Sequence, residues 1–131
     1  MSRSDVLLES IRDFYVDTDN FELLKNILEK KTKISLRNLE WFITDYSKKK
    51  NLTYTTKTGK LFTVHCAYKS SLDGYSKKLF DPFCRTEKIE FRGLQTTVAQ
   101  LNFIRWCIKN DIIDTLINHD PAYLSETKPW L

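Results

Sequence analysis

The chain has 131 residues, of which 41% are hydrophobic, 29% charged and 13% aromatic, and its net charge is +4. This composition is typical of one soluble, intracellular globular domain. Three Gly and three Pro are too few for a sandwich of many tight turns, three widely spaced Cys do not make a disulfide framework, and no apolar run approaches the roughly 20 residues of a membrane span.

Positive charge is concentrated in the middle of the chain. Residues 1–30 carry four basic and seven acidic residues, residues 31–92 carry fourteen and six, and residues 93–131 carry three and four. The net charges of these three segments are therefore −3, +8 and −1. A polyanion or an acidic protein is expected to bind the middle segment.

Residues 1–33 are predicted to form an acidic, helical N-terminal part. Ser4 is the expected N-cap of a first helix, because apolar residues recur after it at three- and four-residue steps. These apolar residues are Val6, Leu7, Ile11, Phe14 and Tyr15. After "DTDN", Asp19 or Asn20 is expected to cap a second helix, which ends in the cationic run "EKKTK".

A third helix is predicted for "SLRNLEWFITDYSKKK", with Ser35 at its start and three lysines at its end. Its apolar positions repeat with helical spacing and predict one buried stripe. The stripe consists of Leu36, Leu39, Phe42, Ile43 and Tyr46. Trp41 lies off this stripe and is expected to cover a neighbouring element.

The pattern then changes from a helical to a strand period. We interpret Leu52–Thr56 and Lys60–His65 as a β-hairpin, because both segments are rich in β-branched and aromatic residues. Gly59 can take the positive φ that the connecting loop requires. A hairpin alone is marginal in water, so "KIEF", Lys88–Phe91, is the expected third strand. A short helix is predicted in between, with Ala67, Leu72 and Tyr75 at helical spacing.

Two more helices are predicted near the C-terminus. Thr97 and Gln100 form a capping-box pattern before an apolar stripe, and Asn110 or Asp111 is expected to cap a last helix that ends at Pro121. The chain is therefore predicted to be a single, helix-dominated α+β domain with a small antiparallel sheet, made of the hairpin and one further strand. Residues 34–119 form its core, and residues 120–131 form a docked tail.

The stretch "KKLFDPFCR" is interpreted as a packed corner. Pro82 disfavours helical geometry at Asp81, whose carboxylate can accept hydrogen bonds from the N–H groups that follow and can hold Arg85. The flanking Phe rings are expected to anchor the corner in the core. The corner comprises Phe80, Asp81, Pro82, Phe83, Cys84 and Arg85.

Two chemical alternatives involve cysteine. Cys84 would be a nucleophile if an imidazole served as its base, whereas burial between two Phe rings favours a structural role. The possible zinc ligands are His65, Cys66, Cys84, Cys107 and His119, and they lack the spacing of a structural zinc site. His65 and Cys66 are expected to point to opposite faces of a strand. We predict no catalytic residue, metal site or cofactor, and no enzymatic activity.

A surface rich in lysine and tyrosine is the candidate interaction site. Cations from a helix end, a hairpin tip and the following segment can converge there: Lys48, Lys49, Lys50, Lys57, Lys60, Lys69, Lys77 and Lys78. Tyr54, Tyr68 and Tyr75 are interleaved with them, and tyrosine rings stack on bases. This pattern is typical of sequence-tolerant nucleic-acid binders, but a face that docks on an acidic protein, or a solvated face, has the same composition.

Three blocks of this sequence resemble a family of short proteins of nucleocytoplasmic large DNA viruses. The blocks are N-L-x-W-F-x-T-x-Y-S-K-K at Asn38–Lys49, F-D-P-F-C-R at Phe80–Arg85 and T-T-x-x-Q-L-N-F-x-x-W at Thr96–Trp106. The resemblance covers about residues 35–118. It implies a viral origin and carries no catalytic assignment.

The leading functional prediction is a non-enzymatic structural protein of a large DNA virus, either a minor capsid protein or an internal virion component. It would be found in the virion and, during assembly, in the host cytoplasm. Its partners would be capsid or other virion proteins, with Trp41, Trp130 and exposed aromatic side chains as anchors. The alternative is a nucleic-acid-binding accessory protein that uses the lysine and tyrosine surface. A third reading is a cysteine-dependent enzyme built on Cys84.

Overall fold

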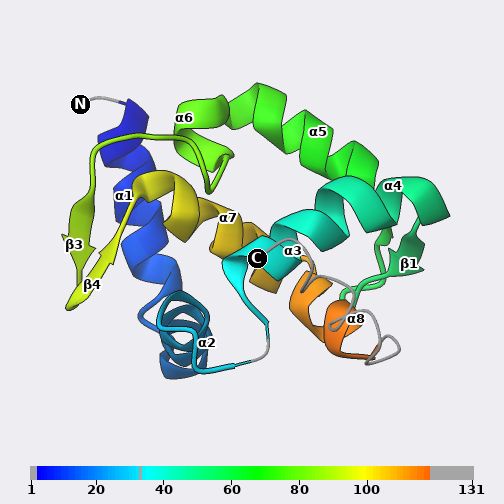
Figure 1. Ribbon diagram of the computed structural model, residues 1–131, viewed down its shortest axis with the longest axis horizontal. Helices are drawn as coiled ribbons and strands as arrows, with labels where there is room; N and C mark the ends of the chain where they lie inside the picture. The colour runs from blue at the N-terminus through cyan, green and yellow to red at the C-terminus, as the bar shows by residue number, and fades with distance from the viewer. Residues whose placement is uncertain (1–2, 33, 119–131) are drawn as a thin grey trace.

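The computed structural model describes residues 3–32 and 34–118, which form the helix-dominated α+β fold that the sequence predicts (Figure 1). The elements in chain order are α1 (Arg3–Phe14), α2 (Thr18–Leu28), α3 (Leu36–Trp41), the π-helix η1 (Phe42–Tyr46), α4 (Ser47–Lys50), β1 (Thr53–Thr55), β2 (Leu61–Thr63), α5 (Val64–Tyr75), α6 (Lys77–Phe80), β3 (Ile89–Phe91), β4 (Leu94–Thr96), α7 (Val98–Lys109) and α8 (Ile112–Asn118). No helix in this part of the chain is long and apolar enough to cross a membrane. His119, Pro121 and the predicted docked tail with Trp130 lie outside the described residues.

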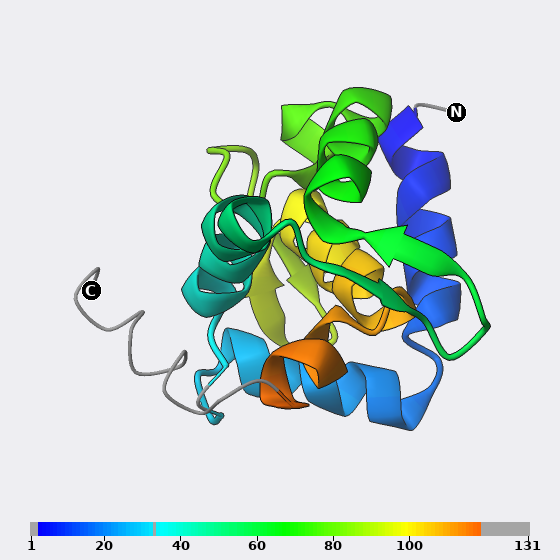
Figure 2. The ribbon, with the colours of Figure 1, turned by 90° about the vertical axis from the view of Figure 1, so that its right-hand side faces the viewer.

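Helix α7 lies at the centre of the fold, and α1, α2, α6 and α8 pack against it (Figure 2). It is buried almost all round, as expected for a helix enclosed by others. Its buried residues are Ala99, Leu101, Asn102, Phe103, Ile104, Arg105 and Cys107. Thr97 is its N-cap, as predicted, and the Thr97 hydroxyl accepts a hydrogen bond from the backbone N–H of Gln100 at 3.1 Å. The sequence thus locates the start of the central helix.

The two N-terminal helices pack their apolar faces on this centre. In α1, Leu7 and Ile11 are buried, and the hydroxyl of buried Tyr15 donates to the carbonyl of Leu101 at 3.0 Å. Val6, predicted to belong to the same face, is 54% exposed. The N-cap of α2 is Asp17 rather than Asp19 or Asn20, since the Asp17 carboxylate accepts from the backbone N–H groups of both residues.

Helices α3, η1 and α4 follow one another without interruption, and Ser35 caps α3 as predicted, accepting from the Asn38 N–H at 3.1 Å. The prediction that Trp41 anchors a partner is wrong, since Trp41 is only 6% exposed and belongs to the core. A π-helical turn follows Trp41, and in such a turn residues five apart come into register. The Trp41 ring accordingly packs against that of Tyr46, with ring centres 5.7 Å apart.

The strands form two separate antiparallel hairpins rather than one three-stranded sheet. β1 pairs with β2, and Gly59 in their loop has φ +85°, as the sequence predicts. β3 pairs with β4 instead of with the first hairpin. The turn between them is Arg92-Gly93, and both residues have positive φ, as a two-residue hairpin turn of this kind requires. This local turn makes the nearby β4 the partner of β3.

The first hairpin is shorter than predicted, because α5 begins at Val64. His65 and Cys66 are consequently helical residues, and the expectation that they point to opposite faces of a strand is wrong. The predicted short helix between Ala67 and Tyr75 is confirmed and is longer at its start. Helix α5 packs against η1 and α4 at one end and against α6 at the other (Figure 1).

Candidate functional site

The lysines predicted to form one surface are all exposed but are spread over several elements. Burial lowers the pKa of His65, and the nearby Lys48 and Lys69 ammonium groups lower it further, so these three residues form one local cluster. Lys77 and Lys78 lie on α6, at the opposite end of α5, a twelve-residue helix about 18 Å long. Lys50 ends α4, and Lys60 lies in the β1–β2 loop.

Two of the predicted lysines are paired with carboxylates. The ammonium of Lys57 lies 2.7 Å from a carboxylate oxygen of Asp114, and the Lys57 backbone N–H donates to the Asp111 carboxylate at 2.7 Å. Lys49 lies 3.3 Å from the Asp45 carboxylate. Exposed pairs of this kind contribute little to stability, but they reduce the positive potential available to a polyanion.

The three tyrosines do not form a platform for base stacking, contrary to the prediction. Tyr68 is 8% exposed, and its ring packs against those of Phe80, Phe103 and Trp106. The half-buried Tyr75 stacks on Phe80, with ring centres 5.7 Å apart. The Tyr54 hydroxyl donates to the carbonyl of Asn110. These rings belong to the core or pack against it, because the packing of the helices, and not the lysines next to them in the sequence, decides their burial.

The predicted corner is present, but only part of it is buried. Asp81 accepts a hydrogen bond from the Phe83 N–H at 2.9 Å, and Phe80 is fully buried, both as predicted. Phe83 is 39% exposed, so the expectation that it anchors the core is wrong. Arg85 is exposed, and no bond joins it to Asp81 in the described part of the chain. The turn at Asp81 therefore sends the two rings in different directions.

A glutamine side chain ties this corner to the rest of the fold. The amide nitrogen of Gln100 donates to the carbonyl of Pro82 at 3.2 Å, and its amide oxygen accepts from the hydroxyl of Thr96 at 2.8 Å. The capping-box prediction assigned this side chain to the backbone of Thr97. Instead it connects α7, β4 and the corner, and so fixes the position of the segment that carries Phe83.

The cysteines lie in three different environments. Cys66 is exposed, Cys84 is intermediate and Cys107 is buried, and burial raises the pKa of the Cys107 thiol. Within the described residues, no group of three or more His, Cys, Asp or Glu side chains could hold a metal ion, and no hydrogen bond joins Cys84 to an imidazole. The sequence predicted that Cys84 is buried between two Phe rings, but its side chain is partly exposed.

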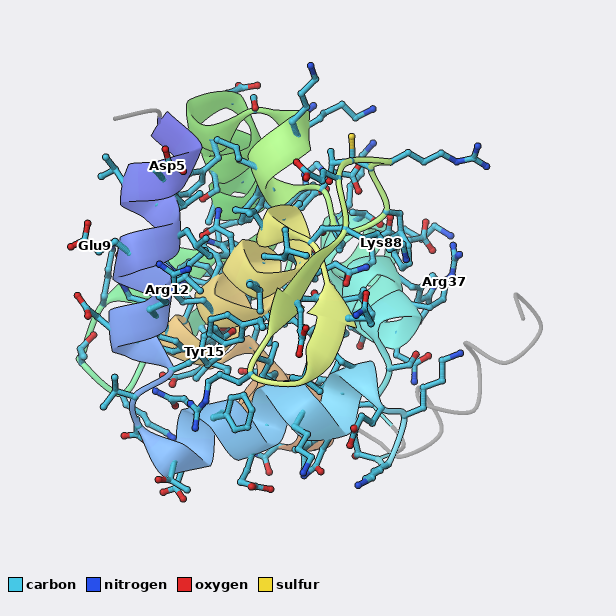
Figure 3. All side chains as sticks on the ribbon, turned by 90° about the vertical axis from the view of Figure 1, so that its left-hand side faces the viewer. Asp5, Glu9, Arg12, Tyr15, Arg37 and Lys88 are labelled. Atoms are coloured by element: carbon cyan, nitrogen blue, oxygen red, sulfur yellow. The ribbon has the colours of Figure 1, made fainter. Side chains whose placement is uncertain are left out.

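A groove of about 610 Å³ lies between α2, the start of α3 and the Phe83 corner, and we call it the α2–α3 groove. Its lining residues are Ile27, Leu28, Lys30, Ser35, Leu36, Arg37, Phe83, Lys88, Gln95 and Gln100. None of these described residues is acidic. Figure 3 shows Arg37 and Lys88 together, on the side of the molecule away from the α1 residues Asp5 and Glu9. The groove thus combines cations with apolar surface.

Two contacts position parts of this groove. The Arg37 guanidinium lies over the Phe83 ring, 4.4 Å from the ring centre, which is the geometry of a cation–π contact. Lys30 follows the C-cap of α2 and has φ +58°, while the N–H of Lys31 bonds to the carbonyl of Asn26 at 2.9 Å. This is a Schellman-type helix end, at which glycine is usual and lysine is not.

Sequence reasoning missed this groove. Lys30, Arg37 and Lys88 were not among the predicted interaction residues, because Lys88 is far along the chain from the other two and only the fold brings it beside them. The "EKKTK" run predicted a helix end. The left-handed backbone of Lys30 and its place in the groove wall could not be predicted from that run. Of the residues predicted for the interaction surface or the corner, only Phe83 lines the groove, and it was assigned to the core.

Comparisons with known proteins place the chain in a family. A search of solved structures finds no match. The chain is 37% identical to Uncharacterized protein L507 of Acanthamoeba polyphaga mimivirus, over 82% of this chain and 47% of that protein. The chain therefore spans about half the length of this curated relative, whose source agrees with the viral origin that the resemblance implies. Residues 1–126 match a family of unknown function, DUF7197, and the chain belongs to that family.

Proposed function

We propose that this chain is a non-enzymatic interaction protein of a large DNA virus, which binds an acidic segment of a virion protein in the α2–α3 groove. The observation that carries this proposal is the composition of the groove. Three cationic side chains and an exposed Phe ring surround it, and none of its described lining residues is acidic. Positive charge beside apolar surface is complementary to an acidic peptide with an apolar residue.

Each part of the groove has a role in this proposal. The planar guanidinium of Arg37 can bind a carboxylate through two parallel hydrogen bonds, and Lys30 and Lys88 supply further ammonium donors. Phe83, Leu28 and Leu36 offer apolar contact to a side chain between the acidic residues. Aromatic and Arg side chains are the residues that most often dominate binding energy at protein interfaces.

Nucleic-acid binding is the alternative function. Sequence-tolerant binders combine a basic track along the backbone with several exposed rings. Here Tyr54, Tyr68 and Tyr75 are engaged within the fold, and Lys49 and Lys57 have carboxylate partners. These observations favour an acidic protein segment over a nucleic acid.

Within the virion, the role that fits such a docking protein is that of a minor capsid or internal component. Quantitative mass spectrometry of purified particles tests it. A fixed ratio of this protein to the major capsid protein is expected. Trace amounts that vary between preparations, together with salt-sensitive binding of the free protein to DNA, would instead identify a nucleic-acid accessory factor.

A further inference from the structure

A second pocket, on the other side of the fold, is built around a buried arginine. It has a volume of about 570 Å³ and is lined by residues of α1, α5, α6 and α7. Its walls are mainly apolar and include Val6, Leu7, Tyr75 and Leu79. The exposed Val6 thus belongs to a pocket wall. The volume is within the range of small-molecule sites.

Arg105 is the cationic group of this pocket, and it is only 7% exposed. Its guanidinium donates to the hydroxyl of Ser10 at 2.7 Å and to the amide oxygen of Asn102 at 2.9 Å. Both partners are neutral, and no carboxylate of the described residues lies within ion-pair distance of it. A buried charge without a counter-charge is costly, and a bound anion would offset that cost.

The guanidinium is also held in a defined orientation. The side-chain nitrogen of Asn102 donates to the carbonyl of Leu79 at 2.9 Å, so the amide oxygen of Asn102 faces Arg105. A guanidinium has five N–H donors, and these hydrogen bonds use two of them. Three N–H donors of this pocket-lining residue are therefore left without a hydrogen-bond acceptor among the described residues.

We propose that this pocket binds an apolar monocarboxylate, with the carboxylate on Arg105 and the hydrocarbon body against Val6, Leu7 and Leu79. A carboxylate matches the planar guanidinium in shape and in single charge. A phosphate ester would bring about −1.5 to −2 charges to a site with one lining cation, and is therefore a poorer fit. Two sources share this chemistry: a fatty acid, and the C-terminal carboxylate of a peptide with an apolar last residue.

Calorimetric titration of the whole chain tests the site. Octanoate is expected to bind at least about tenfold more tightly than octanol, which has the same body without the charge, and than octyl phosphate. A short peptide that ends in leucine, as the free acid and as the C-terminal amide, distinguishes the second source from the first. Preference for the acid form in either pair supports the site.

Four variants locate the binding. Arg105→Met should weaken octanoate binding at least about tenfold, whereas Arg85→Met, which changes an exposed arginine that lines neither this pocket nor the α2–α3 groove, should not change it. A Cβ at Gly74, on the pocket wall, meets nothing within 4 Å, so Gly74→Leu has room for its side chain and should narrow the pocket and weaken binding, while Gly74→Ala retains it. Because Gly74→Leu keeps Arg105, it tests the proposal even if Arg105→Met does not fold.

Two results would overturn the proposal. One is equal binding of octanoate and octanol, or no binding of any acid of either source. The other is octanoate binding that survives Gly74→Leu unchanged.

Discussion

The guanidinium of Arg37 lies 4.4 Å from the centre of the Phe83 ring, at the edge of a groove that no described acidic residue lines. Phe83 is only three residues from the fully buried Phe80, yet it is turned outward by the Asp81-Pro82 corner. Gln100 holds that corner through the Pro82 carbonyl. The exposed ring is therefore part of a braced structure, as expected for a residue that contacts a partner.

The two phenylalanines of the corner should respond differently to removal. Phe80→Ala is expected to lower the free energy of unfolding by about 3–5 kcal/mol, because a fully buried ring is lost. Phe83→Ala should lower it by only about 1 kcal/mol, the cost of an exposed cation–π contact and some apolar area. Urea unfolding of both variants measures this difference. Similar losses of unfolding free energy for the two variants would show that Phe83 is a core residue.

Lys30 is expected to lower the free energy of unfolding while it supplies a cation to the groove. Left-handed geometry is unfavourable for residues with a Cβ, so Lys30→Gly should raise the free energy of unfolding by about 1 kcal/mol. The same change should weaken the binding of an acidic peptide, since it removes a groove cation. Lys31→Gly is the matched control, because Lys31 lacks positive φ and pairs with Glu29 at 3.1 Å. It should not stabilise the protein.

Tyr68 makes stability depend on pH in the alkaline range. Burial raises the pKa of Tyr68 from 10.0 to about 12, with smaller contributions from Asp81, Glu40 and Cys107. The folded state therefore holds this proton more tightly than the unfolded chain does. Its stabilising contribution is complete below about pH 10 and is lost as the pH rises from about 10 to about 12.

The variant Tyr68→Phe tests this effect. No hydrogen bond between described residues uses the Tyr68 hydroxyl, so the variant should match the natural protein near neutral pH. Between about pH 10 and about pH 11, its unfolding midpoint in urea should fall less steeply than that of the natural protein. Identical slopes would show that other groups cause the alkaline loss of stability.

The cysteine thiols should react with a thiol reagent in the order of their exposure. Cys66 is expected to react first, Cys84 more slowly, and Cys107 only after unfolding, because it is buried and its pKa is raised. Mass spectrometry of the labelled native protein gives this order. Labelling of Cys84 ahead of Cys66 would indicate an activated thiol and would revive the reading of a cysteine-dependent enzyme.

Local signals in the sequence predicted local structure well. Ser35 and Thr97 cap their helices because capping depends on a hydrogen bond to a residue three positions on. The positive φ at Gly59 follows from its loop in the same way. The second hairpin was missed although Arg92-Gly93 is itself a local signal, because strand alternation at Lys88–Phe91 was read without its turn.

Surface features depend on long-range packing and were predicted less well. Trp41 was expected to anchor a partner at the surface, and the π-helical turn that follows it has no marker in the residue pattern, so its place in the core was missed. The cations of the α2–α3 groove meet only because α2, α3 and the β3 segment fold together. Charge counting correctly located the basic middle of the chain but could not show which lysines are paired with acids.

Peptide binding by two matched charge-reversal variants is the most direct test of the groove. One variant combines Arg37→Glu with Lys88→Glu, and the other combines Lys48→Glu with Lys69→Glu, so both change the net charge equally. A short acidic peptide with one Phe should bind the natural protein more tightly than oligothymidylate does. Only the Arg37→Glu/Lys88→Glu variant should weaken the binding of that peptide at least about tenfold. Equal weakening by both variants, or tighter binding of the oligonucleotide, would contradict the account.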